Sequence, residues 1–224
     1  VTSKPTGMTE RELMEATEAE AQMALQDRVI QETADAMNLL ESTVYSMRDA
    51  MSGRYAAYAA EAAKGELSEM FNAIEEWLYE DGMDAEKAVY DAKLADLTAK
   101  TGPIVARENE ASERPAVLRK LEAAITTFAN FAAADEEAYA HIDKEEKDKV
   151  SAAAAAAREW LGEAQAKLEG ASPTEDPPLK VAEISAKVSE LEGLCGPIMR
   201  TPRPAPPPAP AAEAEAATPP AEGE

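Results

Sequence analysis

The chain has 224 residues, of which 44 are acidic and 22 basic, so its formal net charge at neutral pH is −22. Such a charge repels phosphate backbones and anionic headgroups, which argues against nucleic acid and membrane partners and favours a basic protein surface. No apolar run approaches the ~20 residues that span a bilayer. A single cysteine allows no disulfide within the chain and suits a reducing compartment, so we expect a cytoplasmic location.

The composition predicts an all-α fold, because good helix formers dominate and glycine is scarce. We expect an antiparallel helical bundle with long first helices, followed by a disordered tail rich in proline and alanine. The predicted boundaries are a linker from an upstream domain over residues 1–8, a helical bundle domain over 9–200, and the tail over 201–224.

The first predicted helix begins at a capping box, in which Thr9 and Glu12 can each satisfy a backbone N–H at the helix start. Further along, apolar residues recur at spacings of three, four and seven, which indicates one buried helical stripe. The members of this stripe are Met37, Leu40, Val44, Met47, Met51 and Tyr58.

The next helix is predicted over residues 66–80 and has two distinct faces. Its apolar face consists of Leu67, Met70, Phe71, Ile74, Trp77 and Leu78. Its polar face carries Asn72, Glu75, Glu76 and Tyr79. Gly82 follows shortly afterwards and is predicted to end the helix in the left-handed conformation.

A helix after Asp84 is predicted to break at Thr101-Gly102-Pro103, and a polar loop is expected from there to about Pro115. Two more helices with apolar stripes should follow, separated from a last short helix by a linker over residues 170–178. Gly196-Pro197 is expected to close that last helix.

The sequence offers no catalytic, cofactor-binding or metal residues that we can name, so we do not expect an enzyme. It lacks the glycine-rich phosphate loops, the zinc-binding histidine pair and the nucleophile elbow. Adjacent acids such as Glu75 and Glu76 point about 100° apart on a helix and do not converge. His141 fits a capping or surface role, and Cys195 fits a small buried apolar residue.

A series of motifs resembles the C-terminal helical domain of the heat shock protein 110 family, the large and divergent branch of the heat shock protein 70 superfamily. The motifs occur in order, with matching gaps, over about residues 7–204, and the Trp-Leu-Tyr block and the Cys-x-Pro-Ile-Met ending are hard to obtain by chance. They are MALQDR (23–28), VYSMRD (44–49), EEWLYEDGMD (75–84), Gly102-Pro103-Ile104 with Arg107 and Glu110, Glu113-Arg114-Pro115, Glu159-Trp160-Leu161 and CGPIM (195–199).

The resemblance implies a co-chaperone. Members of the family act as nucleotide exchange factors for heat shock protein 70 and hold unfolded polypeptides against aggregation. Their helical domain lies against the partner's nucleotide-binding domain, and the resemblance places this contact at Asn72 and Glu75, with Glu76 and Tyr79 as neighbours. Their ATP-binding domain and β-sandwich precede this part and are missing here, so the resemblance implies a fragment whose parent binds ATP upstream.

Two other functions stay open at this point. The chain could be the lid of a substrate-holding chaperone that prevents aggregation without an exchange role, and exposed methionines around Met14, Met23 or Met37 would favour this reading. It could also be a generic helical scaffold or adaptor that binds through the proline-rich tail, although this leaves the ordered series of motifs unexplained.

Overall fold

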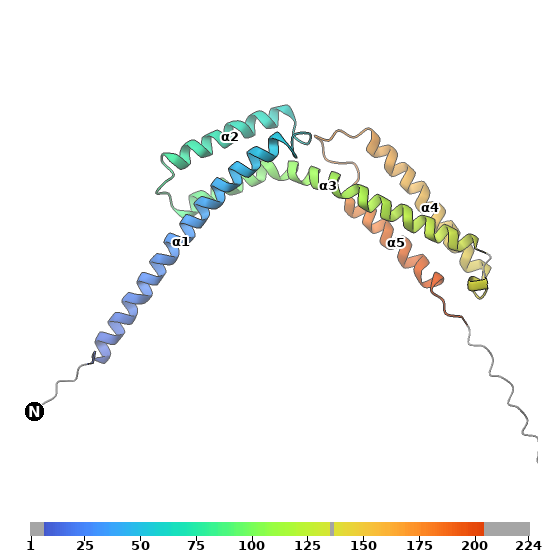
Figure 1. Ribbon diagram of the computed structural model, residues 1–224, viewed down its shortest axis with the longest axis horizontal. Coiled ribbons are helices and arrows are strands. Elements are labelled where there is room, and N and C mark those ends of the chain that lie inside the picture. Colours follow the sequence, from blue (N-terminus) through green and yellow to red (C-terminus); the bar gives the residue numbers. More distant parts are fainter. Residues whose placement is uncertain (1–6, 135–136, 204–224) are drawn as a thin grey trace, which may run out of the picture. The chain divides into compact units, whose positions relative to one another are not determined.

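The computed structural model describes residues 7–134 and 137–203 (Figure 1). These residues contain helices and no strand, which confirms the all-α prediction and the long first helix. The elements are α1 (Glu10–Ser52), α2 (Glu61–Tyr79), α3 (Lys87–Ala133), the short 3-10 helix η1 (Glu137–Tyr139), α4 (Lys144–Glu169) and α5 (Val181–Met199). Most of the predicted tail and the first six residues of the predicted linker lie outside the described residues.

The chain divides into two compact units. The first unit comprises residues 1–120 and 161–186, and the second comprises 121–160 and 187–224. The single bundle domain and the domain boundaries predicted from the sequence are not tested by this division and stay predictions.

In the first unit, α1 begins as predicted. The backbone N–H of Thr9 donates to the Glu12 carboxylate at 2.7 Å, and the N–H of Glu12 donates to Thr9 Oγ1 at 3.3 Å. The backbone N–H of Thr9, and then its hydroxyl, which donates to Glu12 Oε2 at 2.8 Å, lower the pKa of the Glu12 carboxyl. Every described residue from 7 to 32 is exposed, and Figure 1 shows this part of α1 extending beyond α2.

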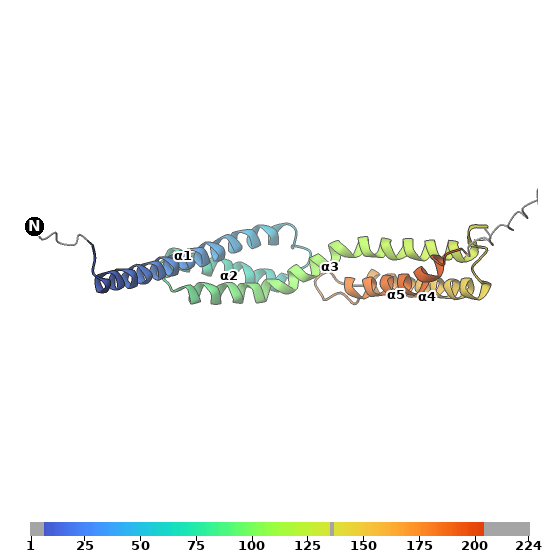
Figure 2. The same cartoon turned by 90° about the horizontal axis from the view of Figure 1, so that it is seen from below.

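The core of the first unit forms where the second half of α1 packs beside α2 and the first half of α3 (Figures 1 and 2). The apolar stripes predicted for α1 and α2 face this core, because residues three and four apart share one side of a helix. Its most buried members are Leu40, Val44, Ala59, Leu67, Phe71, Ile74, Leu78, Tyr90, Leu97 and Ile104.

The predicted break at Thr101-Gly102-Pro103 and the polar loop after it are wrong, because α3 continues through Pro103 and Pro115. A proline inside a helix loses one hydrogen bond and crowds the carbonyl four residues earlier. Here the surrounding helix is packed into the core: Thr101 and Ile104, on either side of Pro103, are each 3% exposed. Tertiary packing therefore outweighs the local signal.

Gly82 ends α2 for a different reason from the one predicted, since no described glycine has a positive φ. Its N–H donates to the Trp77 carbonyl at 2.7 Å. A Cβ at this position would lie 2.7 Å from the Trp77 carbonyl oxygen and 2.9 Å from two atoms of the indole. The glycine is thus required by space, and the Tyr90 hydroxyl donates to its carbonyl and closes the turn.

In the second unit, the later part of α3 lies beside α4 and α5 (Figures 1 and 2). The helices approach through a mixture of large and small buried residues: Leu121, Ile125, Phe128, Phe131, Ile142, Val150, Ala154, Ala157, Val188, Leu191 and Cys195. As expected, Cys195 is fully buried, and burial raises the pKa of its thiol. The expected closure at Gly196-Pro197 is wrong, because Pro197 lies inside the last turn of α5, where only one hydrogen bond is lost.

Candidate partner-binding surface

The residues predicted to contact a partner lie along the boundary between α1 and α2 in the first unit. On α2, Asn72, Glu75 and Tyr79 are spaced by three and four residues and so share one side of the helix. On α1 the facing side chains are spaced in the same way. We call the six residues that bond across this boundary the α1–α2 seam: Glu41, Tyr45, Arg48, Asn72, Glu75 and Tyr79.

Arg48 organises the centre of the seam. One guanidinium nitrogen donates to Glu75 Oε1 at 2.7 Å, and the other donates to Asn72 Oδ1 at 2.9 Å. The same guanidinium lies 5.8 Å from the centre of the Phe71 ring, so it also covers the core below. The Glu75 side chain is only 20% exposed, and its charge is therefore already paired within the chain.

The other end of the seam is aromatic. The Tyr79 hydroxyl donates to Glu41 Oε1 at 3.0 Å and lies 3.1 Å from the Tyr45 hydroxyl. The hydrogen bonds with Tyr45 and then Glu41 raise the pKa of Tyr79, so its hydroxyl stays protonated. Tyr79 is nevertheless 64% exposed, and most of its ring is available to a partner.

Glu76 differs from the other predicted contact residues. It is exposed, and its carboxylate makes no hydrogen bond or ion pair with another residue in the described parts of the chain. It follows Asn72 by four residues, so it lies one helical turn along the exposed side of α2. The structure thus joins Asn72, Glu75 and Tyr79 in one bonded seam and leaves Glu76 as a solvent-facing charge next to it.

The packing of α2 fixes the direction in which these side chains point. Phe71 and Leu78 are buried on its inner face. Trp77 is half-buried at the edge towards α3, with its ring 5.5 Å from that of Tyr90 in an edge-on arrangement and the Lys93 ammonium 4.2 Å from its centre. A face held in this way loses little conformational entropy when it binds.

Sequence reasoning missed the α1 half of the seam. Arg48 and Tyr45 belong to the VYSMRD block, which was used only for the resemblance. The available signal was spacing: Glu41, Tyr45 and Arg48 are four and three residues apart, beside a stripe already predicted to be buried. The charge of Arg48 gave no hint of which acid on another helix would pair with it.

The described residues contain no cluster of three or more potential metal ligands. Within the same residues, no helix is both long enough and apolar enough to cross a membrane. The polar side chains gathered at the seam bond to one another across two helices.

Comparisons with known proteins give matches along most of the chain. The family described as "Hsp70 protein" matches residues 1–110, and the family described as "HYOU1-like, C-terminal domain" matches residues 125–197. Heat shock 70 kDa protein 15 of Arabidopsis thaliana is 36% identical over 193 residues, which are 86% of this chain and 23% of that protein. Heat shock 70 kDa protein 4 of Homo sapiens is 36% identical over 190 residues, covering 84% and 23%. No solved structure matches the chain significantly.

The fold and these matches define a chaperone-related helical domain of the heat shock protein 70 superfamily. Within that superfamily, the chain belongs to the heat shock protein 110 family and is its C-terminal helical domain. It spans only about a quarter of the length of these relatives, 23% in both cases.

Proposed function

We propose that this chain is the helical arm with which a nucleotide exchange factor of the heat shock protein 110 type docks on the nucleotide-binding domain of heat shock protein 70, where it assists ADP release and protein folding. The observation that carries the proposal is the α1–α2 seam with the adjacent Glu76. A packed helix there presents an amide, a phenol and a carboxylate on one side, at the positions that the family resemblance implies.

The chemistry of this surface selects a basic partner. Glu76 is the charge most accessible to a lysine or arginine, because no internal cation neutralises it. The Asn72 amide nitrogen can donate to a carbonyl, since its Oδ1 accepts from Arg48. Tyr79 adds an exposed ring with a polar tip, the kind of residue that often contributes most to binding energy in protein interfaces.

Arg48 gives the surface a second property. Any cation that approaches Glu75 must share it with Arg48, so Glu75 contributes as part of a bonded pair. The pair positions the Asn72 oxygen and limits the gain from a new ion pair at this point. Glu76 and Tyr79 should therefore dominate the affinity, and Glu75 should mainly keep the seam in shape.

The proposal includes no chemical step within this chain. ATP would bind to the upstream domain of the parent protein, and we propose that the present chain is not an enzyme. We also propose a cytoplasmic location, because the single cysteine suits a reducing compartment. We propose no nucleic acid or membrane partner, because the net charge of −22 disfavours both kinds of anionic surface.

The test is a titration of the nucleotide-binding domain of heat shock protein 70 with this chain, followed by calorimetry or fluorescence anisotropy at low and physiological salt. The binding should be weak, since the chain spans only 23% of the length of these relatives, and it should weaken further with salt. Glu76→Lys with Tyr79→Ala should lower the affinity by about tenfold or more.

The matched control is Glu163→Lys, which makes the same change in charge at an exposed position on α4. It should leave the affinity within about twofold. Equal losses in the seam variant and the control would show that only net charge matters, and unchanged affinity in both would remove the seam from the interface. Helicity and melting of all variants should stay near those of the parent chain.

A second function, holding unfolded polypeptides, is favoured by one observation. In the uncovered part of α1, Met14, Met23 and Ile30 are 69%, 57% and 67% exposed. Met14 and Met23 lie nine residues apart and so face opposite sides of the helix, while Met23 and Ile30, seven apart, share a side. Met37 instead packs against the core.

The holding function predicts that this chain suppresses the aggregation of a thermally denatured client enzyme, measured by light scattering. Met23→Gln with Ile30→Gln should weaken the suppression, whereas the seam variant should keep it. If a several-fold molar excess of the parent chain does not suppress aggregation, this second function is refuted, and the proposed docking on heat shock protein 70 is not affected.

A further inference from the structure

Two lysines of α3 mark out a stretch of the boundary between α2 and α3. The Lys93 ammonium lies 4.2 Å from the centre of the Trp77 ring, and Lys100 Nζ donates to Glu66 Oε2 at 3.3 Å. The two lysines are seven residues apart, so they lie on nearly the same side of α3 and about 10 Å from each other along it. At both ends of this stretch, therefore, a cation of the chain lies on α2.

Between the two ends the boundary is hollowed into a groove of about 660 Å³, entirely within the first unit. Its apolar lining consists of Met70, which is half-buried, and of Ala73 and Ala99, which face the groove from the two helices and are exposed. An alanine side chain ends at Cβ, so these two positions leave space that larger side chains would fill. The groove is accessible from solvent and has an apolar floor.

The rim of the groove has an excess of negative charge. It consists of Glu66, Glu69, Asp96 and Lys100. Lys100 is the one cation among the described residues that line the groove, and it is already paired with Glu66. Glu69 and Asp96 are exposed, and their carboxylates make no hydrogen bond or ion pair with another residue in the described parts of the chain.

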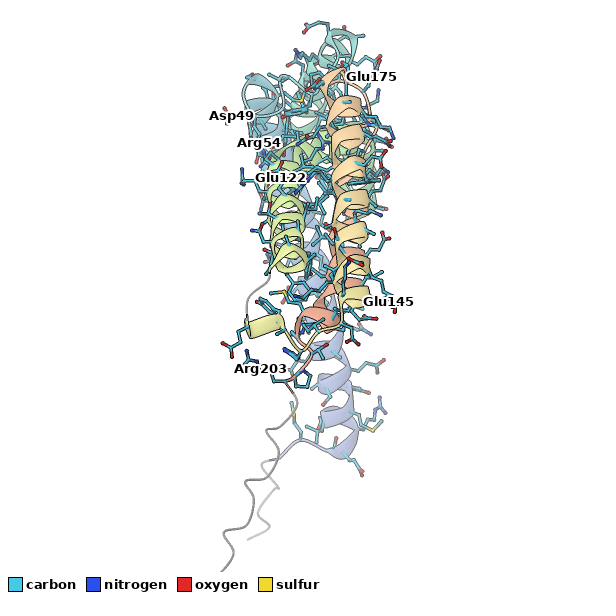
Figure 3. The ribbon with its side chains drawn as sticks, turned by 90° about the vertical axis from the view of Figure 1, so that its right-hand side faces the viewer. Asp49, Arg54, Glu122, Glu145, Glu175 and Arg203 are labelled. Carbon is cyan, nitrogen blue, oxygen red and sulfur yellow. The ribbon has the colours of Figure 1, made fainter. Side chains whose placement is uncertain are left out.

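Acids at other helix boundaries of the same unit are matched by cations of the chain itself. Arg48 pairs with Glu75 between α1 and α2. Arg54, which follows α1 and is labelled in Figure 3, donates to the Glu108 carboxylate of α3. The middle of the α2–α3 groove lacks such a cation, although it combines an apolar floor with two carboxylates.

We propose that this groove binds a basic peptide segment of a partner protein through an arginine side chain. The methylene stem of the arginine lies on Met70, Ala73 and Ala99, and its guanidinium donates to Glu69 and Asp96. An apolar stem with a cationic head matches an apolar floor with an acidic rim. Arginine fits better than lysine, because its planar fork of donors suits carboxylates.

This inference goes beyond the proposed docking on heat shock protein 70. The seam lies on the side of α2 that faces α1, whereas the groove lies on the side that faces α3. The two surfaces share no residue, so each can be tested without the other.

The test is a methyl NMR titration of this chain, labelled at its methionine and alanine methyl groups, at constant ionic strength. The probe is an acetylated and amidated peptide in which leucine and arginine alternate with alanine. The comparison peptide has citrulline at each arginine, which keeps the shape and removes the charge. We expect saturable shifts at the methyl groups of Met70, Ala73 and Ala99, and binding of the citrulline peptide about tenfold weaker or more.

Two pairs of variants separate the groove from general charge attraction. Ala99→Leu fills the groove without a change in charge and should weaken binding about tenfold or more, since the stem loses its place. Ala95→Leu makes the same change at an exposed position on α3 outside the groove and should leave the affinity within about twofold. Asp96→Asn should weaken binding about threefold, the effect of one exposed ion pair. Asp49→Asn, at the exposed α1 position labelled in Figure 3, should not change it.

The outcomes decide the proposal. Saturable shifts at the groove that are lost with citrulline and with Ala99→Leu support it. Failure of the arginine peptide to bind, equal binding of the citrulline peptide, or equal affinities of Ala99→Leu and Ala95→Leu would overturn it. Shifts spread over the whole chain, with equal losses in Asp96→Asn and Asp49→Asn, would also overturn it, since they would show attraction to the net charge alone. None of these results affects the α1–α2 seam.

Discussion

Replacing Phe71 by alanine tests the packing of α2 separately from the side chains of the binding surface. Phe71 is buried, whereas the next residue, Asn72, belongs to the seam. Phe71 is 2% exposed, packs among Leu67, Ile74 and the stripe of α1, and carries the Arg48 guanidinium on its outer side. Truncation removes the ring and leaves a cavity, which costs about 3–5 kcal/mol. In a unit of this size the melting temperature should fall by roughly 6–20 °C.

The assay is thermal unfolding followed by tryptophan fluorescence in a Trp160→Phe background, so that Trp77 alone reports on the first unit. Asn72→Ala is the matched control on the neighbouring, exposed position, and its free energy of unfolding should change by less than about 0.5 kcal/mol. A Phe71→Ala loss below about 1 kcal/mol would refute the assignment of this residue to the core that holds α2 in place.

Three further predictions concern single positions. Gly82→Ala should lower the melting temperature, because its Cβ would lie within 3 Å of the preceding turn, whereas Gly65→Ala, with open space around it inside α2, should stabilise by about 0.5–1 kcal/mol. The hydrogen bond from Arg54 lowers the pKa of the Glu108 carboxyl below 4.5, so the stability that Glu108 contributes is present above pH 4.5 and is lost as the pH falls through its lower folded pKa. The urea midpoint of Glu108→Gln should therefore change less between pH 3 and pH 6 than that of the parent chain. An equal change in both proteins would contradict this prediction. Cys195, fully buried and with a raised thiol pKa, should react with a thiol reagent at pH 8 only as fast as the protein opens, and immediate reaction would place it at the surface.

Helical periodicity predicted those parts of the fold that depend on burial of one face. The stripes of α1 and α2 were found because Leu40, Val44, Phe71 and Ile74 repeat at helical spacing, and each of them is buried. The capping box at Thr9 was equally local, since both of its hydrogen bonds lie within one turn.

The errors came from local signals that tertiary contacts outweigh. Pro103 breaks an isolated helix, but here the buried neighbours on both sides keep α3 continuous. Gly82 suggested a left-handed turn, whereas the close approach of the Trp77 ring and carbonyl is what requires a glycine. A single sequence does not reveal which distant atoms will lie next to a given residue.

Only the α2 half of the candidate surface could be predicted from the sequence. The α2 residues followed from one amphipathic helix and the family resemblance, so Asn72 and Tyr79 were named. Their partners on α1 depend on the register of two antiparallel helices, which pairs Arg48 with Glu75 and Tyr45 with Tyr79. That register places a paired carboxylate where the sequence suggested a free one and moves the accessible charge to Glu76.

The most direct test of the central claim is site-specific photocrosslinking to the nucleotide-binding domain of heat shock protein 70. A photoreactive phenylalanine analogue at Tyr79 keeps the aromatic ring on the seam, and the same analogue at Glu163 on α4 serves as the control. We expect an adduct from position 79, mapped by mass spectrometry to a basic surface of the partner, and little from position 163. Equal yields at both positions, or no adduct from Tyr79, would contradict docking through the α1–α2 seam.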